Sequence, residues 1–307
     1  MTSTPDDGKT PPPEWQRQEE RGSLFWLRLM SRLSLLFGRR LSRPLLYGIV
    51  LYFVLAASEA RKAARANLTR ILGRRARWPD LYRNVFAFAS TIHDRTYLLN
   101  DRSDLFDIRT AGAETLHAVH ATGKGCLLFG AHLGSFEILR GIARDHGGLN
   151  VAAAMYPENA RRLNDTLAAI NPDVILDVIA LGQFDAMLAI HQRLEEGAMV
   201  GVLADRASGQ DKYIAMPFLG ATAGFPSGPF RMAAMLRQPV FFMSGLYRGG
   251  NRYDIRFELL EDFAEPPAGR REDIARALLE KYVAALERHC RSAPYNWFNF
   301  YDFWNTI

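Results

Sequence analysis

A histidine and a glutamate stand five positions apart, directly after an apolar stretch. Residues 124–131 read KGCLLFGA, His132 follows, and Glu137 comes five residues later. On one continuous helix, five steps would separate the two side chains by about 140°. If His132 lies in a turn and Glu137 in the first turn of a helix, a carboxylate can orient the imidazole and raise its basicity. The pair predicts a general base; the alternative is a capping histidine and an ordinary first-turn glutamate.

A second pair of charged residues ends the apolar run VGVLAD, where Asp205 is followed by Arg206. Two interpretations stay open for this pair. It can be the solvated end of a strand, or it can belong to a site.

The segment at 217–229 is rich in Gly and Pro, and we expect a loop there. Gly220 would allow a ligand to approach the backbone closely, and the amide of Ser227 would open the next helix toward an anion. Arg231 would face the same region one turn later. Because Phe218 and Phe225 make the loop apolar, it favours the wall of an acyl-chain site over an ordinary surface turn.

Several familiar chemistries find no support in the sequence. The seven histidines form no H-x3-H or HExxH cluster, and the two cysteines lie 164 residues apart. We therefore expect no metal, no cofactor and a reducing compartment. Lys124 does not belong to a P-loop, and Ser135 lacks the GxSxG context of a serine hydrolase.

The elements that must position these residues alternate between strand and helix after Gly112. The pattern predicts an α/β fold, with a central, largely parallel sheet flanked by helices and an antiparallel final pair of strands. Expected strands are 125–131, 149–156, 174–181, 198–204, 239–247 and 253–260; expected helices are 135–145, 158–170, 184–196, 227–237 and 271–289.

Ligands of such folds bind beyond the carboxyl ends of the strands. His132 and Glu137, the segment 156–164, the pair Asp205 and Arg206, and the segment 216–231 all fall at predicted strand ends. That shared edge favours a site over a capping role for His132.

Charge is concentrated near the N-terminus. Residues 17–77 carry 14 Lys and Arg against three Glu, a balance of +11 in a chain whose net charge is +5. Basic residues interleaved with Leu, Trp and Phe fit an anionic membrane surface better than a nucleic acid. We divide the chain into a disordered tail (1–14), a basic, amphipathic, membrane-associating helical region (15–110) and an α/β domain (111–307).

The longest uncharged apolar run, PLLYGIVLYFVLAA at 44–57, is shorter than the roughly 20 residues that span a bilayer. Arginines flank it on both sides. An interfacial helix is the favoured interpretation, with burial in the protein or a full span as alternatives. We find no signal peptide in the first residues.

Two blocks of sequence resemble the bacterial lipid A late acyltransferases of the lysophospholipid acyltransferase superfamily. These are GAHLGSFEIL at 130–139, which carries the His-x4-Glu signature, and ADRASGQDKYIAMPFLGATAGFPSGPFRMA at 204–233. The resemblance covers roughly residues 15–300. The opening EWQRQEERGS and the closing PYNWFNFYDFW look more like a branch of predicted acyltransferases found near aryl-polyene or related lipid loci.

The resemblance implies a reaction. His132, oriented by Glu137, would deprotonate a hydroxyl or amine of a lipid or glycolipid, which attacks an acyl thioester carried by acyl carrier protein or CoA. Backbone amides at a helix start, helped by Arg206, would stabilise the oxyanion. Arg161, Arg162 and Asn164 resemble a substrate-positioning stretch. The expected location is the cytoplasmic face of the bacterial inner membrane.

Two other functions stay open at this point. A lipid or thioester hydrolase could use the same base on water. A membrane-associated lipid-binding protein would need no catalysis. The sequence names neither the acceptor nor the chain length.

Overall fold

The computed structural model describes residues 24–138, 150–174, 176–183, 185–206, 212–265 and 269–305. The predicted tail at 1–14 and most of the helix expected at 135–145 lie outside the described residues.

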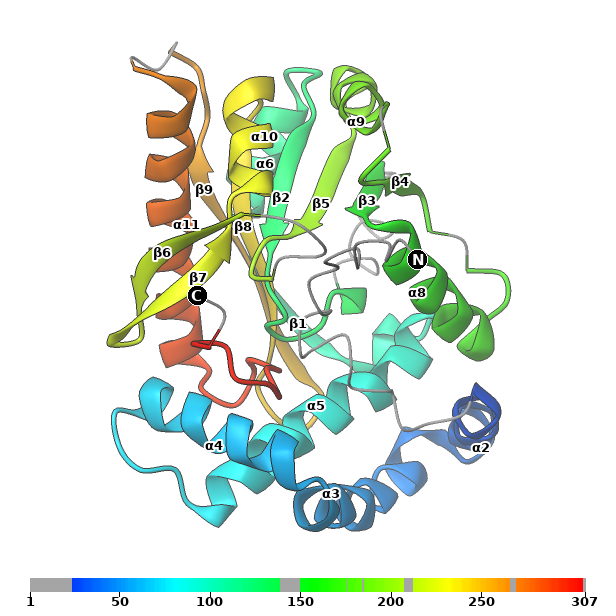
Figure 1. The fold of residues 1–307 in the computed structure, drawn as a ribbon. Coiled ribbons are helices and arrows are strands. Elements are labelled where there is room, and N and C mark those ends of the chain that lie inside the picture. The colour runs from blue at the N-terminus through cyan, green and yellow to red at the C-terminus, as the bar shows by residue number, and fades with distance from the viewer. Residues whose placement is uncertain are drawn as a thin grey trace, which may run out of the picture.

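Seven strands form one sheet in the order β1-β9-β8-β2-β5-β3-β4. All neighbouring strands are parallel except β8 and β9, which are antiparallel. The largely parallel α/β fold and its antiparallel final pair are thereby confirmed (Figure 1). The strand bounds are Asp107–Ala111 (β1), Cys126–Gly130 (β2), Val151–Met155 (β3), Val178–Ala180 (β4), Met199–Leu203 (β5), Val240–Tyr247 (β8) and Arg252–Glu261 (β9).

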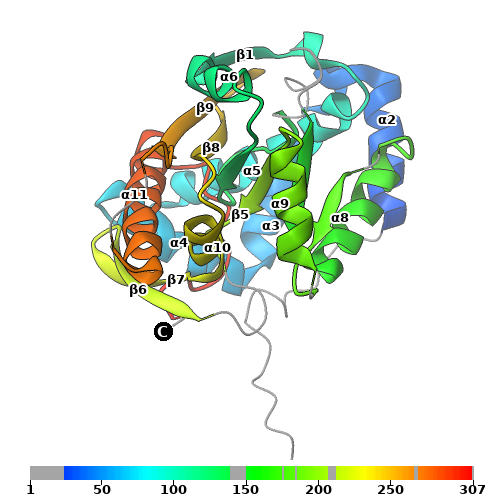
Figure 2. The same ribbon diagram turned by 90° about the horizontal axis from the view of Figure 1, so that it is seen from above.

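Both faces of the sheet are covered, and the alternation of side chains along β2 shows how. Leu127 and Phe129 point to one face, where they pack with residues of α9, α10 and α11. Cys126 and Leu128 point to the opposite face, where Leu116 of α6 covers them. Figure 2 shows the two layers from above. The helices are Ala113–His120 (α6), Pro157–Ile170 (α8), Ala186–Glu195 (α9), Gly228–Leu236 (α10) and Arg271–Ser292 (α11).

The segment that the sequence indicates as a loop is a β-hairpin, so that prediction is wrong. Strands β6 (Tyr213–Phe218) and β7 (Ala221–Pro226) pair antiparallel through a two-residue turn. Leu219 and Gly220 both have positive φ, +50° and +82°, as a tight hairpin turn requires. Phe218 and Phe225 are fully buried and pack edge-to-face against Phe303, so their apolar surface serves core packing instead of an acyl-chain wall.

Four helices of the described residues precede the sheet and gather beneath it in Figure 1. They are α2 (Leu24–Ser42), α3 (Leu45–Ala56), α4 (Ser58–Leu72) and α5 (Trp78–Leu98), and a short 3-10 helix follows at Ser103–Leu105. The helix α2 is bent at Gly38, whose φ of 77° is not helical. The helix α5 joins this group to the sheet, because its Tyr97 and Leu98 pack in the same cluster as Tyr253 and Ile255 of β9.

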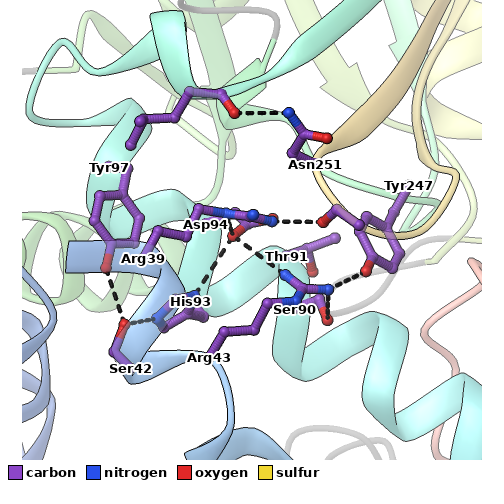
Figure 3. Close-up of polar contacts among 12 residues, drawn as sticks. Arg39, Ser42, Arg43, Ser90, Thr91, His93, Asp94, Tyr97, Tyr247 and Asn251 are labelled. Atoms are coloured by element: carbon purple, nitrogen blue, oxygen red, sulfur yellow. Dashed lines mark hydrogen bonds and ion pairs between the residues drawn. The ribbon is translucent and has the colours of Figure 1, made fainter.

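A buried carboxylate fastens α2 to the rest of the protein (Figure 3). Asp94 of α5, whose side chain is fully buried, lies 2.8 Å from Nε of Arg39 and 3.8 Å from Nη1 of Arg43. Tyr253 of β9 donates its hydroxyl to the same carboxylate at 2.8 Å. Burial alone would raise the pKa of Asp94, but the nearby His93 and the hydrogen bond and charge of Arg39 lower it. A charge buried this deeply is stable only with such partners.

The helices α2 and α3 bury one side and expose the other. Leu46, Val50 and Val54, spaced four residues apart, face the protein. Among the residues that the structure describes, no helix combines the length and the apolar character that crossing a bilayer requires. The large apolar side chains left exposed are Leu24, Phe25, Leu33, Leu35, Leu36, Phe37 and Leu41 of α2, and Leu45, Tyr47, Ile49, Leu51, Tyr52, Phe53 and Leu55 of α3.

Candidate active site

The parallel strands β2 and β5 bring a histidine and an aspartate together. The two strands are neighbours, and their last paired residues are Gly130 and Leu203. His132 and Asp205 each stand two residues beyond that pair. Since parallel strands end at the same edge of a sheet, the two side chains lie side by side there. They form the centre of the candidate site at this edge.

Asp205 holds His132 through both of its carboxylate oxygens. Nδ1 of His132 lies 2.9 Å from Oδ1, and the backbone N–H of His132 donates to Oδ2 at 3.0 Å. A carboxylate only accepts, so Nδ1 carries the proton and Nε2 keeps its lone pair. The Asp205 side chain is fully buried, whereas the imidazole keeps 34% of its surface exposed. The arrangement presents a basic nitrogen with a fixed tautomer to solvent.

The electrostatics of the pair keep the aspartate ionised and the histidine neutral. Burial would raise the pKa of Asp205, but the His132 and Arg206 charges and the hydrogen bonds from His132 bring it to about 2. Burial lowers the pKa of His132, and the positive charge of Arg206 lowers it further, while Asp205 offsets part of this effect. A neutral imidazole near pH 7 is the form that can accept a proton.

Glu137 does not orient the imidazole, contrary to the sequence-based expectation. A helix begins at Glu137, as predicted, but its carboxylate points to other partners. Oε1 lies 2.7 Å from Nε of Arg95 on α5, and Oε2 accepts a hydrogen bond of 3.0 Å from the hydroxyl of Ser135. Arg95 of α5 therefore neutralises the charge of Glu137. Asp205 orients the imidazole, which is the role that we expected of Glu137.

The turn that bears His132 is fixed along its backbone. The amide of Gly134 donates to the carbonyl of Asn296 at 2.9 Å, and the amide of Ser135 donates to the carbonyl of Gly245 at 2.8 Å. Gly134 has a φ of +81°, and a Cβ added there would lie 2.0 Å from the Gly245 carbonyl oxygen. Only glycine fits this close approach of two backbones.

Arg206 is hydrogen-bonded to the C-terminal segment. Its Nη2 donates to the carbonyl of Phe298 at 2.9 Å and to Oδ1 of Asn299 at 3.3 Å, and its guanidinium lies 5.0 Å from the ring centre of Tyr301. Its Nε is 3.9 Å from Oδ2 of Asp205. Arg206 therefore contributes charge to the site while its hydrogen bonds go elsewhere.

The other residues singled out from the sequence are not gathered at His132 by any contact that the structure gives. Arg162 and Asn164 are exposed on α8, whose first residues follow β3 at the same edge of the sheet. Arg231 is exposed on α10. The expectation that the Ser227 amide binds an anion is wrong, because that amide donates to the carbonyl of Lys212 at 2.8 Å. Gly220 occupies the turn of the β6–β7 hairpin, where no neighbouring atom lies within 4 Å of an added Cβ.

Two contributors to the site escaped sequence reasoning. Arg95 lies in an amphipathic helix, and a charged residue in such a helix is usually expected to face solvent. The stretch Asn296–Phe298 follows the last helix, and no motif in the sequence marks it as part of a site. Within the described part of the chain, no group of three or more His, Cys, Asp or Glu side chains could hold a metal ion.

Comparison with known families gives one match. Residues 14–306 match the family described as bacterial lipid A biosynthesis acyltransferase. A comparison with curated proteins gives no match.

Proposed function

Since the chain belongs to the bacterial lipid A biosynthesis acyltransferase family and is an acyltransferase, we propose that it moves a fatty acyl group from an acyl thioester to a hydroxyl or amine of a lipid or glycolipid acceptor. The donor is acyl carrier protein or CoA carrying the acyl chain. The proposed reaction needs neither a metal nor a cofactor.

The proposed chemistry starts at Nε2 of His132. This nitrogen takes the proton from the acceptor hydroxyl or amine, whose oxygen or nitrogen then bonds to the thioester carbonyl carbon. The tetrahedral intermediate collapses by breaking the C–S bond, and the leaving thiolate takes the proton back from the imidazolium. Asp205 keeps the ring in one tautomer and stabilises the imidazolium between the two steps.

The oxyanion of that intermediate needs donors that the protein does not already use. The amides of His132, Gly134 and Ser135 are bonded to Asp205, Asn296 and Gly245. The helix that begins at Glu137 offers its first N–H groups next to the same turn, and N–H groups at a helix start have no partner within the helix. We assign the oxyanion to these amides in place of Arg206, whose hydrogen bonds serve the C-terminal segment.

The observation that carries this proposal is the 2.9 Å contact between Nδ1 of His132 and Asp205, which leaves Nε2 on a partly exposed ring. The test measures thiol release and acylated product from an acyl thioester and a lipid acceptor. His132→Ala should lose transfer by about 10²–10⁴-fold, the usual contribution of a general base. His191→Ala, an exposed histidine on α9, is the matched control and should leave the rate unchanged.

The same assay separates the other candidate functions. Thiol release that proceeds equally well without an acceptor would identify a hydrolase. Wild-type turnover in His132→Ala would remove the proposed base, and a cellular role that survives this substitution would indicate lipid binding without catalysis.

We further propose that α2 and α3 lie on an anionic membrane at the cytoplasmic face of the bacterial inner membrane. The exposed apolar side chains of the two helices support this, because so large an apolar surface is unusual on a monomeric soluble protein. Arg28, Arg32 and Arg40 are exposed on α2 and add attraction for anionic lipid. The ion pair of Arg39 with Asp94 holds α2 against the protein, so the surface is presented in a fixed orientation (Figure 3).

Substrate contacts beyond His132 are proposed for Arg162 and Asn164. Both are exposed on α8, and this helix starts at the edge of the sheet where β2 and β5 end. Arg231 stays a candidate on the same basis of exposure alone.

A further inference from the structure

The segment that follows α11 lies between the N-terminal helices and the turn at 131–135, which bears His132 and which we call the catalytic turn. It is irregular after Ser292 and runs between α4 and the β6–β7 hairpin (red in Figure 1). Irregular backbone in a buried position must find partners for its N–H and C=O groups. Those partners show what the segment is attached to.

On its inner side, the segment is attached to the catalytic turn. The amide of Phe298 donates to the carbonyl of His132 at 2.8 Å, and the carbonyl of Asn296 accepts from the amide of Gly134 at 2.9 Å. Leu133 and Trp297 form an isolated antiparallel bridge between these two contacts. The catalytic turn is therefore paired with the segment over three consecutive residues.

The same stretch holds Arg206. The carbonyl of Phe298 accepts from Nη2 of Arg206 at 2.9 Å, so one residue fixes the histidine backbone through its amide and the guanidinium through its carbonyl. Nε of Arg206 is buried and has no hydrogen-bond partner among the described residues, although Oδ2 of Asp205 is 3.9 Å away. The position of this charge beside Asp205 is thus determined by the segment and not by a bond to the aspartate.

On its outer side, three buried asparagines hold the segment. Nδ2 of Asn67 on α4 donates to the carbonyl of Asn299 at 2.8 Å, and Nδ2 of Asn84 on α5 donates to the carbonyl of Tyr295 at 3.1 Å. Asn296 pairs its side-chain amide with the N–H and C=O of Tyr247 on β8, at 2.7 and 3.0 Å. A buried side-chain amide destabilises the protein unless it is hydrogen-bonded, and each of these three is hydrogen-bonded to backbone groups.

We propose that residues 296–301 are a positioning element of the active site, in which Phe298 sets the catalytic turn and Arg206 in one register and Asn67 anchors the segment from α4. This inference rests on the proposed role of His132 as a base. In this proposal the segment acts through its contacts with the catalytic turn and Arg206, and touches neither substrate nor the reacting atoms.

The expected signature is a change in protonation of the base. The charged groups acting on His132 are Asp205 and Arg206, and the charge of Asp205 also raises the pKa of Tyr282, Tyr301 and Cys290. Burial raises the pKa of each of these three groups, so they stay neutral at working pH. Arg206 is then the only one of these groups whose displacement from the site would raise the pKa of His132.

The test compares kcat/KM as a function of pH in two leucine variants. Asn67→Leu removes the donor to Asn299 and keeps the branched shape of the side chain. Asn251→Leu is the matched control, because Nδ2 of Asn251 donates to the Leu105 carbonyl at 2.9 Å without touching the segment (Figure 3). Asn67→Leu should lower kcat by up to about 10²-fold and shift the acid limb of kcat/KM to higher pH. The control should change neither.

Arg206→Met and Arg206→Lys keep the proposal testable if Asn67→Leu does not fold. The methionine variant should move the acid limb to higher pH, and the lysine variant, which keeps the charge, should move it less. If Arg206→Met leaves the limb in place, or if Asn67→Leu folds and loses activity equally at every pH, the segment serves folding alone and the proposal is overturned. Absence of transfer in the wild-type protein would instead overturn the proposed function.

Discussion

Glu137 lies 2.7 Å from Nε of Arg95, and this ion pair joins the start of the helix after the catalytic turn to α5. The neighbouring residue on α5, Asp94, binds Arg39 of α2. Two consecutive residues of one helix thus serve two different contacts, one with the proposed membrane-facing helix and one with the active-site turn. The carboxylate that follows His132 in the sequence supports the turn, and the carboxylate that orients the ring comes from β5.

This division of roles predicts different consequences for the two carboxylates. Asp205→Asn should lower kcat by roughly 10²–10⁴-fold, because the amide can stabilise the wrong tautomer of His132 and cannot balance an imidazolium. Glu137→Gln should lower kcat much less and reduce the free energy of unfolding, because it leaves Arg95 without its ion pair. Steady-state kinetics and urea unfolding of both variants provide the comparison. A larger kinetic loss in Glu137→Gln would restore Glu137 as the orienting residue.

The pH dependence of transfer should reflect the lowered pKa of His132. Burial and the Arg206 charge lower this pKa below the ordinary value of 6.5. Because the neutral ring is the active form, the midpoint of the acid limb of kcat/KM should lie below pH 6.5. A profile of kcat/KM from pH 4.5 to 8 measures the midpoint of this limb, and a midpoint above 6.5 would contradict the electrostatics described for the site.

The parts of the fold that the sequence predicts are those with strong local patterns. The run at 239–247 is apolar except for Ser244, and β8 is buried along its whole length. In contrast, β1 (Asp107–Ala111) is an edge strand with mostly exposed residues and has no apolar run to mark it. Pro217 and Pro226 made the β6–β7 hairpin look like a loop, although they pair with Thr222 and Tyr213 and a two-stranded ribbon tolerates Pro on its edge strands.

The site was predictable as a location and not as a set of contacts. His132 and Asp205 both follow apolar runs, so their place at the carboxyl edge could be inferred from pattern. Their contact depends on β5 being the neighbour of β2, and strand order is a long-range property that no local pattern encodes. Glu137 was the nearer carboxylate in sequence, but packing against α5 directs it to Arg95.

Membrane binding should depend on the exposed leucines of α2. Leu36 and Leu41 have 76% and 71% of their surface exposed, and burying one such side chain contributes about 1.5–3 kcal/mol. Leu36→Ser and Leu41→Ser should each weaken binding to anionic vesicles by roughly tenfold or more. Vesicle flotation measures the bound fraction.

Leu188→Ser is the matched control for this experiment. Leu188 is 58% exposed on α9, away from α2 and α3, and its loss should leave vesicle binding unchanged. Raised salt should weaken binding in all three variants and in the wild type, because Arg28, Arg32 and Arg40 act through screened charge. Equal losses in the control and the α2 variants would argue against these helices as the bound surface.

Removing the buried carboxylate that fastens α2 should destabilise the protein strongly. Asp94→Asn leaves the guanidinium groups of Arg39 and Arg43 without their ionised partner, and breaking a buried pair of this kind typically costs about 3–5 kcal/mol. Urea unfolding measures the change. Asp273→Asn removes a carboxylate from an exposed pair with Arg270 and should leave the unfolding midpoint unchanged. Similar midpoints for the two variants would mean that Asp94 does not hold α2.

Gly134 and Gly220 have nearly the same φ. Alanine substitutions at the two positions therefore share the strain of a positive φ, and only the one at Gly134 adds steric crowding at the catalytic turn. Gly134 and Gly220 have φ values of +81° and +82°, so alanine at either position carries a strain of about 1–2 kcal/mol. At Gly134 the added methyl would also meet the Gly245 carbonyl oxygen at 2.0 Å, which forces the turn away from β8; at Gly220 it meets nothing within 4 Å.

Gly134→Ala should therefore lose about 10²-fold or more in kcat, because the imidazole is displaced. Gly220→Ala should lose some stability but keep kcat and its preference among acyl donors of different length. The assay is kcat over a chain-length series for both variants, and a selective loss of long donors in Gly220→Ala would return the hairpin turn to the acyl-chain site.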